Sequence, residues 1–163
     1  YTTTFANTQI SVKPNSSMIE LSNTDFLGQV NRFSQQIISC CLQLGSQQNS
    51  TFPVATWIEQ TFFKRALMCH ENIALQAANH INIAESTFRR RWKKLQLVEV
   101  NCADEFHQLL EDFVELILES NITESKVTFM NEILAKSFLS SGTTMKLASK
   151  FLDVSMPTFR KLL

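Results

Sequence analysis

The chain has 163 residues, 44% of them hydrophobic, so it can bury a core and is not an extensively disordered chain. It contains only three glycines and three prolines, too few for a sheet protein with many tight turns, and an all-α fold is predicted. Fifteen Lys and Arg residues balance 15 Asp and Glu residues. A net charge of zero argues against a nucleic-acid partner for the chain as a whole, but it hides an uneven distribution.

The first half of the chain divides into an arm and four predicted helices. Residues 1–21 are rich in Thr, Asn and Ser and show no helical stripe, which predicts a linker or N-terminal arm. Residues 22–97 form a first unit in which apolar residues recur at three- and four-residue spacing. A polar loop is expected from Gly45 to Thr51. The predicted helices run from Phe26 to about Gly45, from Pro53 to about His70, from Ile73 to about His80 and from Ala84 to about Leu95.

The same order of two longer and two shorter helices recurs in a second unit, residues 98–163. The predicted helices run from Phe106 to Leu118, from Val127 to Phe138, from Thr144 to Phe151 and from Ser155 onward. Sliding the sequence by 71 residues aligns Ala77 with Ala148, Asn82 with Asp153, Thr87 with Thr158, Phe88 with Phe159 and Arg89 with Arg160. The first helices align at a different offset, 80, where Phe26 meets Phe106. The chain is therefore predicted to be an internal repeat.

The segment from Ala77 to Leu95 has the pattern of a helix-turn-helix. Small Ala77 allows two helices to cross closely, and Asn82 stands where the chain must turn, because Asn tolerates the left-handed conformation better than most residues. Asp153 occupies the same place in the second copy. The apolar residues expected to pack the second helix are Ile81, Ile83, Phe88 and Trp92.

This segment resembles the Fis family, which includes the C-terminal domains of bacterial enhancer-binding activators. The resemblance covers Ala77 to Leu97 and, more weakly, Ala148 to Leu163. It implies two longer helices ahead of each motif, as predicted here, and two-fold pairing through those helices. The chain then looks like both protomers written in one polypeptide, a pseudo-two-fold dimer free to read unequal half-sites. The family commonly has Ser or Asn followed by Arg at the start of the recognition helix, where this chain has Ala84-Glu85 and Ser155-Met156.

The basic run at the end of the first motif predicts contact with duplex DNA. Five cations and no anion lie between Phe88 and Leu95, whereas the region from Glu99 to Glu124 is acidic. The cations are expected to neutralise phosphates, and the start of the helix to face base edges. Glu85 could accept a hydrogen bond from a cytosine amine or simply favour the helix dipole. The predicted DNA-binding residues are Ala84, Glu85, Ser86, Thr87, Arg89, Arg90, Arg91, Lys93 and Lys94, with Ser155, Met156, Thr158, Arg160 and Lys161 in the thinner second copy.

Other functions find less support in the sequence. There is no Gly-rich phosphate loop or nucleophile elbow, so an enzyme is not expected and no cofactor is predicted. The four cysteines lack zinc-knuckle spacing and are expected to be small core residues. A metal site from Cys69, His70, His80 and Cys102 is not predicted, because these neighbours would not face one way on helices. No stretch is apolar enough for a membrane span, and a cytoplasmic, nucleoid-associated bacterial protein is expected.

Two alternatives to a DNA-binding transcription regulator stay open. One is a dimerisation or protein-interaction module that keeps the fold without binding DNA. The other is an AraC-like regulator with two helix-turn-helix motifs, although there a single long helix links the motifs and here two helices and a loop intervene. An upstream domain or self-association is compatible with each of these readings.

Overall fold

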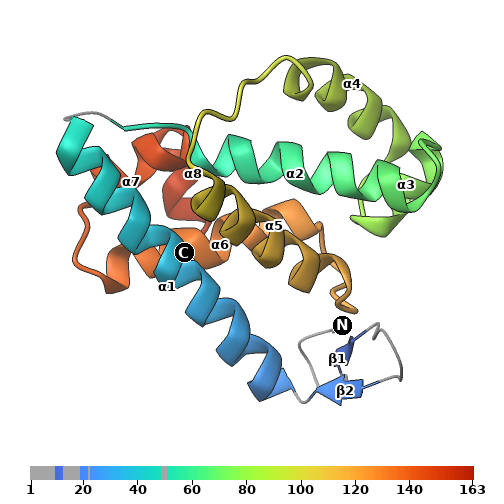
Figure 1. The fold of residues 1–163 in the computed structure, drawn as a ribbon, viewed down its shortest axis with the longest axis horizontal. Coiled ribbons are helices and arrows are strands. Elements are labelled where there is room, and N and C mark those ends of the chain that lie inside the picture. Colours follow the sequence, from blue (N-terminus) through green and yellow to red (C-terminus); the bar gives the residue numbers. More distant parts are fainter. Residues whose placement is uncertain (1–9, 13–18, 22, 49–50) are drawn as a thin grey trace.

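A computed structural model describes residues 10–12, 19–21, 23–48 and 51–163. Eight helices and one two-stranded hairpin make up this part of the chain (Figure 1). The strands are β1 (Ile10–Val12) and β2 (Ile19–Leu21). The helices are α1 (Asn23–Gln48), α2 (Val54–Cys69), α3 (Ala74–His80), α4 (Glu85–Leu95), α5 (Asp104–Leu118), α6 (Lys126–Ser140), α7 (Met145–Leu152) and α8 (Met156–Lys161). The all-α prediction is confirmed for the body of the molecule.

The helix boundaries follow the apolar periodicity closely, with two differences. Residues 10–12 and 19–21 pair antiparallel, with Ile10 opposite Leu21, inside the segment predicted as a linker or arm; the rest of residues 1–21 lies outside the described residues. The predicted loop at Gly45 is wrong in its first part, because α1 continues through Gly45 to Gln48. An isolated glycine costs a helix only about 1 kcal/mol, and the glutamines that follow are good helix formers.

A single hydrophobic core joins all eight helices. The helix α1 packs against α5 and α6, and α2 packs against α5, so the longer helices of one half lie on those of the other. The side chains at this crossing, among them Ile37, Leu110 and Ile117, are fully buried. The predicted boundary between residues 97 and 98 falls in the connection from α4 to α5, and the helices on its two sides complete one another's core.

Aromatic side chains hold the start of α2 against the second half. Phe52 stacks on Trp57 with ring centroids 4.9 Å apart and meets Phe106 and Phe151 edge-on at 6.0 and 5.4 Å. Phe151 in turn stacks on Phe138 at 5.3 Å. Such contacts add about 0.5–1.5 kcal/mol each beyond the area they bury. The aromatic residues are therefore packing groups, as their helical spacing predicted, and α7 is anchored to both α2 and α6.

None of the described helices is both long enough and apolar enough to cross a membrane. The four cysteines are free thiols. Cys41 is buried and Cys40 and Cys102 are half-buried, but Cys69 is exposed at the end of α2, so the prediction that the cysteines are core residues is wrong for Cys69. Cys69 is the last residue of α2, and its side chain is not on the face of the helix that packs on the core.

One buried polar contact allows a test of the packing between the two halves. The hydroxyl of Ser34 on α1 donates to the hydroxyl of Ser137 on α6 over 2.6 Å, and both residues are buried. Ser34→Ala should lower the free energy of unfolding by about 1–3 kcal/mol, because the Ser137 hydroxyl loses its partner in a dry environment. Removing both hydroxyls should cost less than the sum of the single changes, as chemical denaturation of the three variants would measure. Additive losses would show that the two hydroxyls do not interact.

Candidate nucleic-acid interface

The segment α3–α4 is a helix-turn-helix whose turn depends on one left-handed residue. Asn82 has a φ of 63°, and the N–H of Ile83 donates back to the carbonyl of Ala78 over 3.0 Å. The Asn82 side chain donates to the carbonyls of Ile122 and Glu124 at 2.5 and 2.9 Å. The prediction of a left-handed turn at Asn82 is confirmed, and its amide also ties the turn to the connection between α5 and α6.

The turn between α7 and α8 repeats this geometry 71 residues later. Asp153 has a φ of 54°, and the N–H of Val154 donates to the carbonyl of Ser149 over 3.1 Å. The loops before the two segments match in part: Glu71 and Gly142 both have positive φ, but Asn72 has a φ of 65° and its counterpart Thr143 has no positive φ. Small Ala77 and Ala148 are both fully buried at the two crossings. The alignment read from the sequence therefore extends to backbone conformation and hydrogen bonding.

Aromatic stacking fixes the orientation of α4. Phe88 is 1% exposed and stacks on Phe63 of α2 with ring centroids 4.4 Å apart, while Trp92 lies nearly parallel to Phe63 at 6.2 Å. At the other end, the buried Gln60 amide donates to the carbonyls of Leu95 and Val98, both at 2.7 Å. The apolar face of α4 thus packs against α2, and its polar face points away from the core.

Two of the predicted phosphate-binding arginines form ion pairs within the protein. The Arg89 guanidinium binds the Glu85 carboxylate one turn earlier, with Nη2 and Oε2 2.6 Å apart. Arg91 makes two parallel hydrogen bonds of 2.7 Å to Glu59 on α2. These bonds raise the pKa of Arg91 above its usual value, although burial opposes them, and the nearby charges of Glu59 and then Asp153 add to the rise. Glu85 and Arg91 are therefore engaged in the fold, each by a carboxylate–guanidinium pair.

The other predicted residues of the first copy remain on the surface. Arg90, Lys93 and Lys94 are exposed on α4. At the start of the helix Ala84 and Ser86 are exposed, and Thr87 is half-buried. The cations that lie free for a phosphate, as far as the described contacts show, are thus Arg90, Lys93 and Lys94.

The second copy presents a shorter helix with fewer cations. Ser155 caps α8, since its hydroxyl accepts from the N–H of Thr158 over 3.3 Å, so this side chain serves the helix start. Met156 is half-buried, whereas Thr158, Arg160 and Lys161 are exposed. A helix of six residues presents a smaller surface than the 11 residues of α4.

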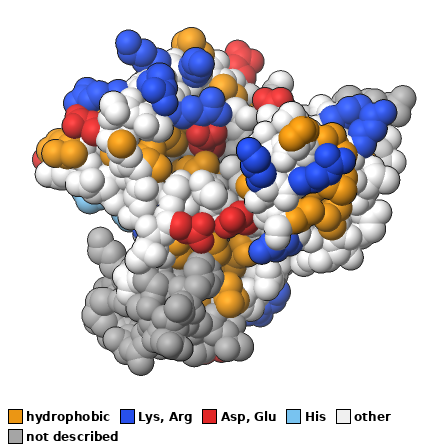
Figure 2. Space-filling model, turned by 180° about the vertical axis from the view of Figure 1, so that it is seen from behind, with side chains coloured by type: hydrophobic (Ala, Val, Ile, Leu, Met, Phe, Trp, Pro, Cys, Tyr) orange, Lys and Arg blue, Asp and Glu red, His pale blue; other side chains and the backbone are white. Residues whose placement is uncertain are grey.

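Both groups of cations lie on one face of the molecule. Figure 2 shows Lys and Arg side chains gathered over α4 and, separately, over the region of α7 and α8, with acidic side chains between them. The cations contributed by α4 are Arg89, Arg90, Arg91, Lys93 and Lys94, and those of α7 and α8 are Lys146, Lys150, Arg160 and Lys161. This face therefore carries two separate groups of positive charge with acidic side chains between them.

Sequence reasoning did not identify Glu59 as the partner of Arg91. The two residues are 32 positions apart, and only the packing of α4 on α2 brings them together. It grouped His70 and His80 only as possible metal ligands and did not link them with Lys126, although all three line one cavity from three different helix ends. No local pattern distinguishes either set, because their proximity is created by helix crossings.

Comparison with protein-family models, with curated proteins and with solved structures finds no match to this chain. Within the part of the chain that the structure describes, no three His, Cys, Asp or Glu residues gather closely enough to hold a metal ion. The assignment of the interface therefore depends on the geometry and charge of the chain itself.

The pairing of Arg91 gives a test of its structural role. Glu59 is only 15% exposed at its side chain and Arg91 is 41% exposed, so Arg91→Ala leaves a largely covered carboxylate without its partner. We expect the free energy of unfolding to fall by about 1 kcal/mol, less than for a fully buried pair because water reaches the guanidinium.

Arg90→Ala is the matched control, since it removes the same side chain from the exposed neighbouring position. It should change stability by less than about 0.5 kcal/mol. Urea unfolding followed by circular dichroism measures both variants. Equal stability of the two would contradict a structural role for the Arg91–Glu59 pair.

Proposed function

We propose that this chain is a DNA-binding module of a transcription regulator, which binds duplex DNA through α4 and, more weakly, through α8. The observation that carries the proposal is the repeated left-handed turn at Asn82 and Asp153, each followed by a helix with exposed cations on the same face. A helix held in this way by a turn can enter the major groove, while cations beside it bind phosphates.

We also propose that the two halves are Fis-like units related by a pseudo-two-fold axis. Three relations support this: α1 packs on α6 as α5 packs on α2, α3 packs on α2 as α7 packs on α6, and the two turns share their hydrogen-bond pattern. An axis through the crossing of α1 and α5 would relate the two helix-turn-helix segments. A bacterial location on the chromosome is part of this proposal.

The contacts of α4 divide its residues into two roles in the proposed complex. Arg90, Lys93 and Lys94 supply affinity through phosphates, because their charges are exposed. Arg91 orients the helix through Glu59, and Arg89 is shared with Glu85. Base readout falls to Ala84, Ser86 and Thr87 and to DNA shape, since the Glu85 carboxylate already accepts from Arg89.

A protein-interaction module is the second candidate. The specific observation in its favour is that carboxylates engage two of the five α4 cations, which lowers the charge offered to DNA. The two candidates differ in their response to salt, because DNA binding by phosphate contacts weakens steeply as salt rises.

The DNA proposal predicts a definite loss in the double variant Arg90→Ala/Lys94→Ala. Affinity for random-sequence duplexes of about two helical turns should fall, and the slope of log affinity against log salt should decrease by about 1 for each cation that contacts a phosphate. Fluorescence anisotropy at salt concentrations from about 50 to about 200 mM measures both quantities.

Two further variants complete this experiment. Arg160→Ala/Lys161→Ala should give a smaller loss, because α8 is the shorter helix. Arg32→Ala removes an exposed arginine of α1, outside both helix-turn-helix segments, and is the control that should bind as the unchanged chain does. Absence of binding by the unchanged chain at low salt would rule out the DNA proposal and favour the interaction module.

A further inference from the structure

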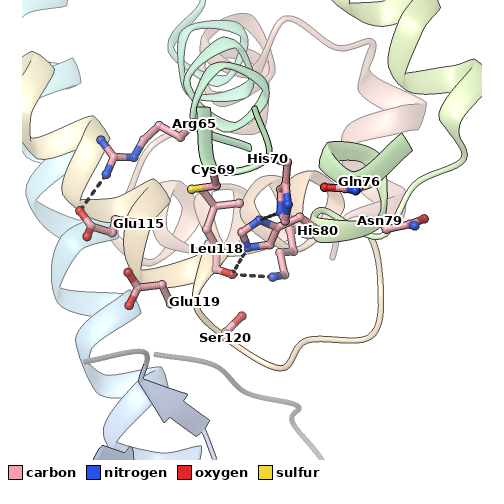
Figure 3. A pocket seen from close by; sticks show the side chains of 11 residues that line it. Arg65, Cys69, His70, Gln76, Asn79, His80, Glu115, Leu118, Glu119 and Ser120 are labelled. Atoms are coloured by element: carbon pink, nitrogen blue, oxygen red, sulfur yellow. Dashed lines mark hydrogen bonds and ion pairs between the residues drawn. The ribbon is translucent and has the colours of Figure 1, made fainter. Parts of the chain in front are cut away.

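A cavity of about 570 Å³ lies beside the first helix-turn-helix, between the end of α2, α3, the end of α5 and the start of α6 (Figure 3). Figure 3 shows Arg65 and Glu115 on one side of it and the rings of His70 and His80 on the other. This volume is in the range of sites that hold small organic molecules. The charged and titratable side chains that line it are Arg65, Cys69, His70, His80, Glu115, Glu119 and Lys126.

Lys126 places a cation in the wall of this cavity without a carboxylate partner among the described residues. The residue is only 4% exposed, and its Nζ donates to the carbonyl of Leu118 over 2.7 Å. An ammonium group carries three donors, and one carbonyl satisfies only part of that capacity. Burial alone lowers the pKa of Lys126 to about 8. A cation in this position is stabilised by any anion that can reach it.

The two histidines form a hydrogen-bonded chain that ends on the same carbonyl. His80 Nε2 lies 2.9 Å from the Leu118 oxygen and must donate to it, since a carbonyl only accepts. His80 Nδ1 lies 3.0 Å from His70 Nε2. The bond between the two rings can form when both rings are neutral, and it can form when one ring carries an added proton. It cannot form when both rings are protonated, because two N–H groups would then face each other. The pair can therefore contribute at most one further positive charge.

Arg65, the other basic side chain of the lining, is paired with carboxylates. Arg65 binds Glu111 at 3.4 Å and Glu115 at 3.2 Å, so its charge is compensated within the protein. Burial, and to a smaller extent the neighbouring Glu115 carboxyl, raises the pKa of the Glu119 carboxyl. The ion pairs among the described residues do not include Lys126, and burial is the only influence on its pKa.

We propose that this cavity binds a small oxyanion, the carboxylate or phosphate group of a small molecule, at Lys126 and the His70–His80 pair. The anion supplies the negative charge that the described residues do not offer Lys126. It also accepts hydrogen bonds from the ammonium N–H groups of Lys126 that do not donate to the Leu118 carbonyl. The proposal is independent of DNA binding.

The position of the cavity connects such an anion to the first turn. The backbone N–H of Lys126 donates to the carbonyl of Ile81 over 3.1 Å, and His80 is the last residue of α3. An anion held here therefore contacts groups that position the α3–α4 turn, whether or not DNA is present.

The test compares thermal unfolding of the full chain in sodium phosphate, in sodium acetate and in sodium chloride of equal ionic strength, at about pH 7. Phosphate or acetate should raise the unfolding temperature above the value in chloride, and the responding salt identifies the preferred oxyanion. Lys126→Met should abolish this difference. Lys136→Met, an exposed lysine on the same helix, should retain it, as should Arg90→Ala/Lys94→Ala, which removes candidate phosphate contacts on α4.

A second measurement does not depend on the folding of a variant. The anion binds the charged form of Lys126, so its effect should be present below about pH 8 and lost as the pH rises above that value toward pH 9.5. Phosphate itself gains negative charge over this range, so a non-specific effect would not decline. No difference from chloride, an equal difference in Lys126→Met, or an undiminished effect at high pH would each overturn the proposal.

Discussion

The burial of the longer helices of one half against those of the other is the constraint on which the structure depends. Phe26, Ile37 and Ile117 have no exposed surface, and they reach that state where α1 meets α5 and α6. Fully burying an aliphatic or aromatic side chain contributes about 1.5–3 kcal/mol, which is a large share of the net stability of a small domain. The two halves of the chain therefore fold as one core, and the shorter helices are positioned by it.

The two left-handed turns set the orientation of α4 and α8 relative to this core. Asn82 and Asp153 accept a left-handed conformation that costs most side chains about 1 to 2 kcal/mol, and Asn82 recovers part of that cost through two side-chain hydrogen bonds. Phe88 and Phe159, both buried, then fix the rotation of the helix that follows each turn. The exposed residues of these helices consequently face away from the core on one side of the molecule.

The two positively charged regions near the first turn, the cations of α4 and Lys126 at the cavity, differ in their electrostatic surroundings. On α4 the carboxylates of Glu59 and Glu85 occupy two arginines and leave the other cations facing water, where salt screens them. At the cavity Lys126 is only 4% exposed, so an unneutralised charge is costly there. The proposed partner of the first region is a polyanion that binds through many weak contacts, and the proposed partner of the second is a single small anion.

The sequence by itself determined the helices, their order and the two turns. Apolar spacing identified each helix to within a few residues, and the shift by 71 residues predicted that Asp153 would share the backbone conformation of Asn82. These features are local, because helix periodicity and left-handed tolerance depend on neighbouring residues. The tertiary structure alone decided that Arg91 binds Glu59, that α1 lies on α6, and that His70, His80 and Lys126 share a cavity. Those contacts join residues far apart in the chain, and only the crossing of helices around the common core brings them within reach.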